Sequence, residues 1–576
     1  MDRTDGASWI VLGRTADEVT AAVLGADGAE RDRITLRTAD LSDWVAGVEG
    51  GAPVRWVWGD TPRWYAALLA AGVRVARCHD LRLCHAILRD SELVAVDAPV
   101  RIAIEWDATP VVEASDAAPA LFDLGDSEDA PTGPPSGIDE CVREFARQRA
   151  AIEGSTDAGR LRLLTAAESA GALIAVELRT AGLPWDAPTH ETLLTDVLGE
   201  RLAGGAPEKL EDAARRVRDA LGDPTASLDS QPKLLRSLHR AGILAESTSR
   251  WELAEYRHPV IEPLLEYKKL SRLLSANGWA WLAEWVHDGR FRPVYVPGGV
   301  VTGRWASSGG GALQIPRQLR PAVRADPGWR LVVADVAQLE PRVLAAMARD
   351  TALADAARGK DLYAGIVETG AVPLRSEAKI AMLGAMYGAT TGDSGRLVPR
   401  LRRTFPRSMA LVDEAARTGE NGGVVTTWLG RSSPPPSATW HEAQSRASDV
   451  AASGVDETRA RRWARDRGRF TRNFVVQGTA AEWALAWMAD LRVRLAAMPP
   501  VAASHAAPRS GVVFATRPHL AFFLHDEVMI HTPASHADAV AVAVREAAAS
   551  AARLLFGDFP IDFPLELRIS ESAQKD

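Results

Sequence analysis

Cysteine is scarce in this chain of 576 residues, which contains only Cys78, Cys84 and Cys141. An odd number of cysteines without paired Cys-x-x-Cys motifs supports neither a disulfide framework nor a structural zinc site. We therefore expect the three thiols to be reduced.

Long apolar runs are missing as well. No stretch of about 18 uninterrupted apolar residues occurs, and no basic segment followed by an apolar one opens the chain. These absences argue against a membrane-spanning protein and predict a cytoplasmic one. Because domains usually hold about 100 to 200 residues, the length predicts three to five of them.

Positive charge is scarce in the first quarter of the chain. Residues 1–140 carry 12 Arg against 25 Asp and Glu, a net charge of −13. The whole chain has a net charge of −8, so the remaining residues carry +5. This mild positive balance suits a nucleic-acid partner, but an arginine-rich solvated surface explains it more simply.

The first segment has the pattern of a small α/β domain, with a helix-like stretch at 65–71 among short apolar runs. These runs are Trp9–Leu12, Val54–Trp58 and Val73–Ala76. A Pro- and Gly-rich run at 129–137 predicts a linker, which ends the first domain near residue 136. From about 140 to 290 the spacing predicts helices, and Pro259 and Pro263 favour a long one that opens at His258.

Asp335 follows the apolar run Leu331–Ala334, which predicts a buried strand that presents a carboxylate at its carboxyl end. A helix should follow, with Pro341 in its first turn. A carboxylate held by a sheet in this way is suited to a divalent metal. Taken alone, Asp335 is explained at least as well as a helix cap or a surface acid.

The segment Leu520–His531 has His525, Asp526 and Glu527 between two apolar runs, which predicts a β-hairpin with carboxylates at its bend. Neighbouring side chains on a strand point to opposite faces, so one carboxylate would face a metal and the other would support it. Ordinary turn chemistry is the competing explanation and, on this segment alone, the better one.

A third segment predicts a helix of a little over three turns, with one stripe formed by residues spaced by four. The stripe contains Arg375, Lys379, Leu383 and Tyr387. Two cations one turn apart repel each other unless an anion lies against them. A bound triphosphate would explain their placement, and a solvated basic helix end explains it equally well. Gly384 and Gly388 would each cost about 1 kcal/mol within the helix, which suggests close approach by a base or another backbone.

Five segments, in this order, resemble the motif series of the family A DNA polymerases. They are Thr302–Arg304, Asp335–Arg342, Arg375–Gly388, Arg469 with Asn473–Ala480, and His525–Glu527. The resemblance runs from about Glu168 to the C-terminus and is strong in combination, although each string is short.

This resemblance implies an α+β multi-domain protein with a right-hand polymerase of palm, fingers and thumb and an N-terminal α/β RNase H-like domain of the exonuclease type. The implied domains are a degenerate 3′-5′ exonuclease-like domain at 1–136, thumb and connecting helices at 137–300, the first part of the palm at 301–345, fingers at 346–470 and the second part of the palm at 471–576. The implied partners are primer-template DNA and dNTPs. We expect a monomer without membrane association that works in the cytoplasm at the nucleoid.

The resemblance also implies roles for individual residues. The catalytic residues would be Asp335, Asp526, Glu527 and Lys379, with two Mg²⁺ ions, replaceable by Mn²⁺, held by Asp335 and Asp526. The dNTP would be bound by Arg375, Lys379, Leu383, Tyr387, Gln338, Tyr363 and Glu340, the last of which would exclude a ribose 2′-hydroxyl. The DNA would be bound by Arg304, Arg461, Arg465, Arg469, Asn473, Gln477 and His525, in part through minor-groove acceptors shared by all base pairs.

Several positions depart from the family pattern. Leu383 stands where phenylalanine or tyrosine is usual, and Tyr363 where histidine is common. Val336, Ala337 and Pro341 are also unusual, and the loop Ser308–Gln314 lacks the usual asparagine. These changes leave the implied metal and triphosphate residues intact but leave rate and fidelity open.

The N-terminal domain lacks the carboxylates that a proofreading exonuclease needs. Trp9–Leu12 carries no Asp-x-Glu, Cys84 replaces a metal aspartate in the motif-like His79–Cys84, and no Tyr-x-x-x-Asp occurs before Glu168. We therefore expect proofreading to be absent and no 5′ nuclease to precede this domain. A residual exonuclease and a catalytically impaired DNA-binding relative stay open as alternatives, whereas a large side chain at Glu340 argues against an enzyme that makes RNA.

Overall fold

The computed structural model describes residues 6–15, 17–107, 133–202, 205–311, 315–388, 392–449 and 452–574. Residues 129–132 of the predicted linker and 312–314 of the loop without asparagine lie outside these ranges. The chain divides into two compact units, the first formed by 1–182, 294–308 and 328–569 and the second by 183–293, 309–327 and 570–576. Within the described ranges, no helix combines the length and the apolar character needed to cross a membrane.

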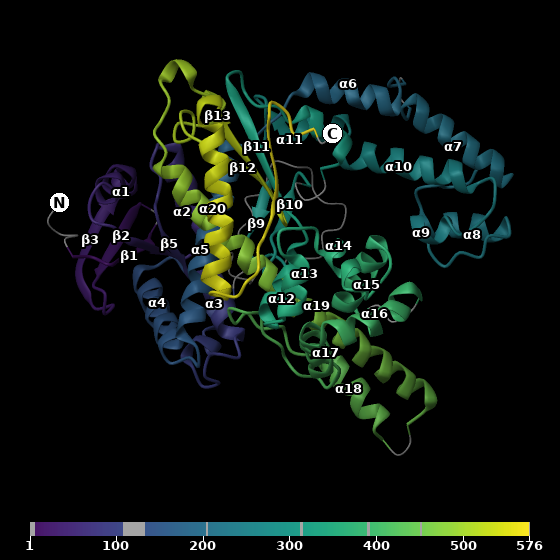
Figure 1. Ribbon diagram of the computed structural model, residues 1–576. Helices are drawn as coiled ribbons and strands as arrows, with labels where there is room; N and C mark the ends of the chain where they lie inside the picture. The colour runs from purple at the N-terminus through teal and green to yellow at the C-terminus, as the bar shows by residue number, and fades with distance from the viewer. Residues whose placement is uncertain are drawn as a thin grey trace. The chain divides into compact units, whose positions relative to one another are not determined.

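A five-stranded mixed sheet in the order β3-β2-β1-β4-β5 opens the first unit (Figure 1). Its strands are β1 (Trp9–Arg14), β2 (Glu18–Leu24), β3 (Glu30–Arg37), β4 (Arg55–Trp58) and β5 (Cys78–Asp80). β1 pairs with β2 and β4, so the apolar runs at 9–12 and 54–58 form neighbouring strands, as predicted. The strand expected from the run at 73–76 is wrong, because Val73 and Val75 are buried in an irregular segment. Their apolar character reflects burial without strand pairing.

Five helices accompany this sheet: α1 (Leu41–Glu49), α2 (Thr61–Ala70), α3 (Leu81–Asp90), α4 (Ile138–Glu153) and α5 (Ala158–Ala181). Trp56, Trp58 and Tyr65 are fully buried in a core that also contains Leu173 of α5 and Phe514. The N-terminal sheet therefore shares its apolar core with later parts of the first unit.

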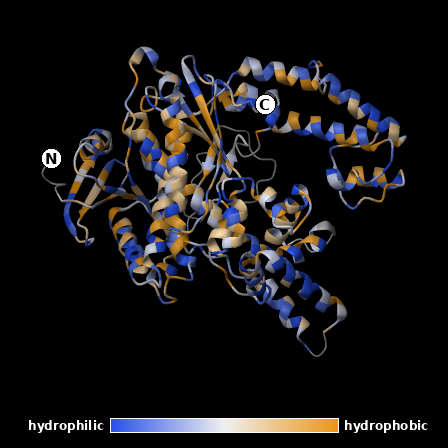
Figure 2. Ribbon diagram, in the orientation of Figure 1, coloured by the Kyte–Doolittle hydropathy of each residue, from blue (hydrophilic) through white to orange (hydrophobic). Residues whose placement is uncertain are grey.

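A second sheet of the first unit has the order β12-β13-β11-β14 and is antiparallel between β11, β13 and β12. Its strands are β11 (Trp329–Val336), β12 (His519–Leu524), β13 (Glu527–Pro533) and β14 (Leu565–Ser570). The strands β9 (Val294–Val296) and β10 (Ala306–Gly309) form a separate two-stranded sheet. The helices α19 (Gly454–Ala497) and α20 (Ala537–Phe556) pack against each other and against this sheet. Figure 2 shows hydrophobic residues along β11 to β13, which agrees with their burial.

The remaining helices of the first unit follow β11. They are α12 (Leu339–Met347), α13 (Thr351–Ala357), α14 (Leu362–Glu368), α15 (Arg375–Tyr387), α16 (Gly392–Thr404), α17 (Pro406–Glu420) and α18 (Ala438–Ala447). The predicted helix with Pro341 in its first turn is α12, and the predicted striped helix is α15, so both predictions are confirmed. Met382, Met386 and Phe405 bury the inner face of α15 in a shared core.

The second unit is mainly helical, as predicted for most of its sequence. Its elements are β6 (Leu183–Pro184), α6 (Ala187–Leu198), α7 (Glu208–Leu221), α8 (Gln231–Arg240), α9 (Arg250–Leu253), α10 (Ile261–Asn277), α11 (Trp279–Trp285), β7 (Val286–His287) and β8 (Arg290–Phe291). The long helix expected to open at His258 begins at Ile261. Trp185, Trp281 and Phe291 pack ring against ring with centroids 5.0 to 5.7 Å apart.

Candidate active site

The sheet brings the predicted carboxylates to one end of β11 and β13. Asp335 is the last residue but one of β11 and lies directly opposite Glu527 in the antiparallel register. Asp526 occupies the tight bend before β13, where its amide donates to the carbonyl of Leu524 at 2.6 Å and its own carbonyl accepts from the amide of Val336 at 2.9 Å. His525 adopts a φ of 54° at this bend, and the antiparallel pairing of β12 with β13 confirms the predicted hairpin. Two segments almost 200 residues apart in sequence are therefore joined beside both aspartates.

The electrostatics of this end favour a cation. Burial, followed by the nearby charge of Asp335, raises the pKa of Asp526 to about 6. Glu527 is only 3% exposed, whereas Asp335 and Asp526 are half-buried. Asp335 and Asp526 are thus the more accessible carboxylates, and Glu527 is the buried one.

A cavity of about 230 Å³ opens beside Asp526. Its lining comprises Gly303–Trp305, Gln338–Pro341, Tyr363, Leu383, Tyr387, Ala480, Ala481, Leu485, Phe523, His525 and Asp526. Eight of the predicted site residues are in this set: Arg304, Gln338, Glu340, Tyr363, Leu383, Tyr387, His525 and Asp526. Segments from distant parts of the sequence therefore converge on one space, and Glu340 and Asp526 are the acidic residues of its lining.

Glu340 is held by two residues of the cavity wall. The guanidinium of Arg304 donates to Oε1, and the hydroxyl of Tyr387 donates to Oε2 at 2.6 Å. Burial and the neighbouring carboxylate both raise the pKa of Tyr387, so its hydroxyl stays protonated and able to donate. The carboxylate of Glu340 is therefore fixed in position on both of its oxygens.

The stripe of α15 lies open along its length. Arg375, Lys379 and Tyr387 are exposed and Leu383 is half-buried. Lys379 has no ion-pair partner among the residues that the structure describes, and it does not line the cavity. One accessible face of the helix therefore carries two cations in its N-terminal half and a leucine and a tyrosine in its C-terminal half.

Arg375 pairs with Asp361, a residue that the sequence patterns did not single out. Its Nη2 and Nε lie 2.7 and 3.1 Å from the two carboxylate oxygens, and its guanidinium lies 5.6 Å from the ring centre of Tyr363. Asp361 also accepts from the side chain of Gln338 at 3.1 Å and caps α14 through the amide of Ala364. An aspartate directly before a helix is a capping signal, which could have drawn attention to it.

The two glycines of the striped helix serve different purposes. A Cβ at Gly384 would lie 2.7 Å from Cβ of Ser394, so close approach of α16 requires glycine there, as predicted. Gly388 is not inside the helix, which corrects the sequence interpretation. It follows α15 with a φ of 73° and caps its end, a conformation that favours glycine.

The predicted DNA-binding residues of α19 form one continuous line spaced by four: Arg461, Arg465, Arg469, Asn473 and Gln477. The arginines are exposed and the two amides are half-buried. A second cavity of about 640 Å³ borders this line and is lined by Arg402, Arg462, Arg465, Arg469 and Arg472 together with Glu420, Asp466 and seven smaller or apolar residues. Asn473 and Gln477 line neither cavity.

In the N-terminal domain, the motif-like residues His79–Cys84 serve the domain's own packing. Asp80 is fully buried, accepts from Thr61 at 2.7 Å and caps α3 through the amide of Leu83 at 3.0 Å. Cys84 is buried against Ser169, with Sγ 3.4 Å from its hydroxyl. In an exonuclease motif these positions would face a metal, whereas here Asp80 and Cys84 contact other residues of the protein.

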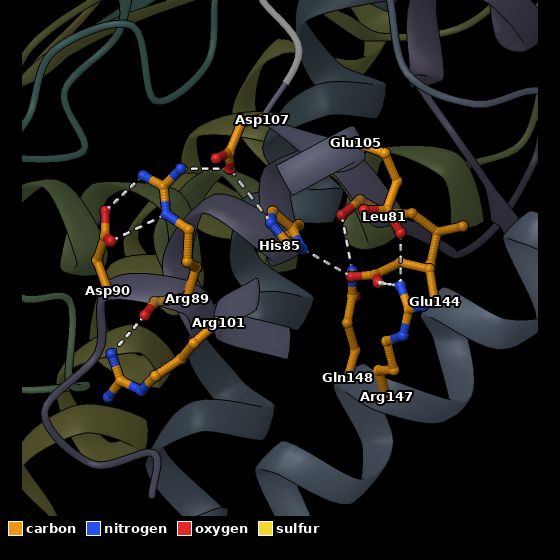
Figure 3. A network of polar contacts seen from close by, with 10 residues as sticks. All are labelled: Leu81, His85, Arg89, Asp90, Arg101, Glu105, Asp107, Glu144, Arg147 and Gln148. Carbon is orange, nitrogen blue, oxygen red and sulfur yellow. Dashed lines mark hydrogen bonds and ion pairs between the residues drawn. The ribbon is translucent and has the colours of Figure 1, made fainter. Parts of the chain in front are cut away.

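A polar network beside this motif ties α3 to α4 (Figure 3). The imidazole of His85 lies 2.8 Å from Glu144 and 3.3 Å from Asp107, and Gln148 donates to Glu144 at 2.7 Å. Throughout the described residues, no group of three or more His, Cys, Asp or Glu side chains is arranged to hold a metal ion.

Comparison with known proteins identifies the family. The model of DNA polymerase family A matches residues 225–574. Because this match covers more than half of the chain, the protein belongs to DNA polymerase family A. The part of the predicted resemblance between Glu168 and residue 224 lies outside this match.

Individual relatives agree with this assignment. The thermostable DNA polymerase I of Thermus filiformis is 28% identical over 356 residues, which is 56% of this chain and 37% of that protein. DNA polymerase I of Chloroflexus aurantiacus is 30% identical over 338 residues, 54% of this chain and 32% of that protein. The matched part of the chain thus spans only about a third of each of these curated relatives.

A solved structure supports the fold over the full length. The structure described as the POL domain of Pol1 from M. smegmatis in complex with DNA primer-template and dNTP has a TM-score of 0.63 and 16% sequence identity. It covers 100% of this chain and 97% of that one. The likeness therefore includes the N-terminal α/β domain as well as the parts that follow.

Proposed function

We propose that this protein is a DNA-directed DNA polymerase that extends a primer 3′-hydroxyl with dNTPs. The observation that carries the proposal is the convergence of Asp335 and Asp526 at one end of the second sheet, beside a cavity walled by Glu340, Leu383 and Tyr387. In a member of the polymerase family, two neighbouring carboxylates and an adjacent cavity would provide the metal ligands and the nucleotide site that phosphoryl transfer requires.

The residues present fit divalent metal ions. Asp335 and Asp526 are two half-buried carboxylates close enough for the charge of one to raise the pKa of the other, an arrangement that a cation would relieve. Mg²⁺ is commonly bound by only one or two carboxylates together with substrate phosphates, which is consistent with a protein ligand set this small. When bound, Mg²⁺ or Mn²⁺ would activate the primer hydroxyl and stabilise the leaving pyrophosphate. Glu527, which lies opposite Asp335 in the sheet, would support the two aspartates.

The open stripe of α15 would bind the triphosphate. Arg375 can offer its guanidinium as a two-pronged donor, and a triphosphate would compete for it with Asp361. Lys379 would act as a point charge one turn further along and donate a proton to the leaving pyrophosphate. Gln338 and Tyr363, which contact Asp361 and Arg375, would keep this end of the nucleotide site in order.

The cavity beside Asp526 would receive the sugar and base. Leu383 and Tyr387 would pack against them, and Glu340 would close the space beside the sugar C2′ position. Because Glu340 is held on both oxygens, it would reject a 2′-hydroxyl as a fixed wall rather than a mobile side chain.

Primer-template DNA would lie along the arginine line of α19. Arg461, Arg465 and Arg469 would follow phosphates, and Asn473 and Gln477 would contact minor-groove acceptors. Arg304 and His525 would border the primer terminus. We further propose that the palm comprises 301–345 and 471–576, the fingers 346–470 and the thumb 137–300, that the protein acts as a monomer, and that the domain at 1–136 does not proofread.

Primer extension on a defined template tests this function. A labelled primer should be extended by the dNTP complementary to the next template base, only with Mg²⁺ or Mn²⁺ present, and not by the three mismatched dNTPs at equal concentration. Extension that ignores the template, or none under any metal, would overturn the proposal.

A further inference from the structure

The turn that carries Arg304 rests on a second arginine, Arg431. Gly303 precedes Arg304 and has a φ of 83°. A Cβ on Gly303 would lie 2.6 Å from Nε and 3.0 Å from Cζ of Arg431. The guanidinium therefore lies directly against the backbone of the turn, and the positive φ favours glycine at this position.

Arg431 is itself fixed by a buried acid. Its Nη2 donates to Oε2 of Glu168 on α5 at 2.7 Å, and the two side chains are 12% and 1% exposed. Its Nε is buried and has no hydrogen-bond acceptor among the described residues. Nη2, the atom that donates to Glu168, would also lie 3.2 Å from a Cβ on Gly303, so the same part of the guanidinium meets both the acid and the turn.

The loop that presents Arg431 is closed on itself and held against α19. The amide of Thr427 donates to the carbonyl of Arg431 at 2.9 Å, and the amide of Arg431 donates to the hydroxyl of Thr427 at 2.9 Å. A Cβ at Gly478 of α19 would lie 2.4 Å from Thr427 and 3.1 Å from the carbonyl of Thr302. This loop, the turn before Arg304 and α19 therefore meet at one point.

The N-terminal domain also supports this loop. The hydroxyl of Ser91, which ends α3, donates to the carbonyl of Gly430 at 2.7 Å, and the amide of Glu92 donates to the hydroxyl of Ser432 at 2.9 Å. A Cβ at Gly430 would lie 2.4 Å from Leu93. The loop is thus clamped between the N-terminal domain and the turn that carries Arg304.

We infer that Arg431 is a positioning residue for Arg304, and that Arg431 is held in place by Glu168 of α5 and, through Ser91–Leu93, by the N-terminal domain. This inference rests on the proposed function, because Arg304 matters through its hydrogen bond to Glu340 in the nucleotide cavity. It gives the N-terminal domain a part in polymerisation that needs no nuclease chemistry.

The test compares two acids of the same helix. Glu168 and Glu177 both lie on α5, both are buried, and both pair with arginine, but only the partner of Glu168 contacts the turn of Arg304. Glu168→Gln and Arg431→Lys should lower kcat, expressed per titrated active site, by roughly ten- to a hundredfold, the scale on which misplacing a group by about 1 Å reduces rates. Glu177→Gln should destabilise the protein yet leave this kcat unchanged.

A double variant tests whether the effect passes through Arg304. Arg431→Lys should add no further loss of kcat to Arg304→Ala, since the residue being positioned is already gone. Losses that multiply, or a wild-type kcat in Arg431→Lys, would overturn the inference.

Amide hydrogen exchange gives a readout that does not depend on activity. The amide of Gly303 donates to the carbonyl of Val300 at 2.8 Å. Exchange across 300–304 should quicken at least severalfold in Arg431→Lys and Glu168→Gln, and stay unchanged in Glu177→Gln. If wild type extends no primer, the proposed function fails, while unchanged exchange in both test variants would contradict the positioning role by itself.

Discussion

The hydroxyl of Tyr387 lies 2.6 Å from Oε2 of Glu340, and this bond joins the end of α15 to α12, the helix that follows β11. Arg304 holds the other carboxylate oxygen. A side chain anchored at both oxygens cannot turn away from added bulk at low cost, so sugar selection should depend on it.

We expect Glu340→Ala to raise ribonucleotide incorporation at least roughly tenfold, because the variant removes one steric and polar barrier. The measurement is kcat/KM for a dNTP and the matching rNTP opposite one template base. Tyr387→Phe, which removes one of the two bonds to Glu340, should give a smaller rise. An unchanged dNTP to rNTP ratio in Glu340→Ala would show that this glutamate is not the gate.

Leu383 should affect a different kind of sugar discrimination. It packs beside the cavity but carries neither a flat ring nor a hydroxyl that could compensate for a missing 3′-hydroxyl. Leu383→Tyr should therefore raise kcat/KM for dideoxynucleotides relative to dNTPs, whereas Leu383→Phe, which adds the ring alone, should not. Equal effects of the two variants would assign the gain to the ring.

Glu177 should make stability depend on pH in the acid range. Burial raises its pKa, but the charges of Arg492 and Arg74 outweigh burial and set the pKa at about 2. A carboxylate with a depressed pKa contributes stability above its unfolded pKa of about 4.3, and that contribution is lost as pH falls toward 2. We compare the free energy of unfolding of wild type with that of Glu177→Gln, both measured by urea unfolding. The difference should be roughly constant above pH 5.5 and should shrink as the pH falls below about 4.5. The total loss between there and pH 2 should be roughly 3 kcal/mol. An advantage independent of pH would contradict this assignment.

Three elements of the site could be predicted from sequence, because each depends on a local pattern of apolar and polar residues. They are the strand that carries Asp335 near its end, the hairpin of Asp526 and the striped helix of Arg375. The contacts of Arg375 with Asp361 and of Arg431 with Gly303 could not be predicted, since each joins segments whose meeting depends on the whole fold. Val73 illustrates the limit, because an apolar run shows burial but not whether the backbone pairs as a strand. The place of Gly388 outside the helix was a missed local signal, since glycine often follows a helix end.

The N-terminal domain should show no nuclease activity. Its buried acids near the motif-like segment are already engaged, Asp60 with Arg82 and Asp80 with Thr61. A labelled single strand and a mismatched primer should both keep their length in Mg²⁺ and in Mn²⁺. Deleting residues 1–136 would open the shared core, so Asp80→Asn is the better control. Shortening that this variant abolishes would establish a working exonuclease.

The central claim is that Asp335 and Asp526 together serve the chemistry of extension. Asp335→Asn and Asp526→Asn keep the size of each side chain and remove its charge, so the fold should persist while metal binding is lost. Primer-template affinity should stay within about twofold of wild type, because phosphate contacts supply the binding. The stabilisation that wild type gains from Mg²⁺ in a thermal unfolding experiment should disappear in both variants.

The most direct measurement is single-turnover extension by these two variants on a saturating primer-template. The account predicts a rate below about 1% of wild type for each, a loss of the size expected when a group acting only in the transition state is removed. Extension by either variant at a rate close to wild type, with DNA binding intact, would contradict it.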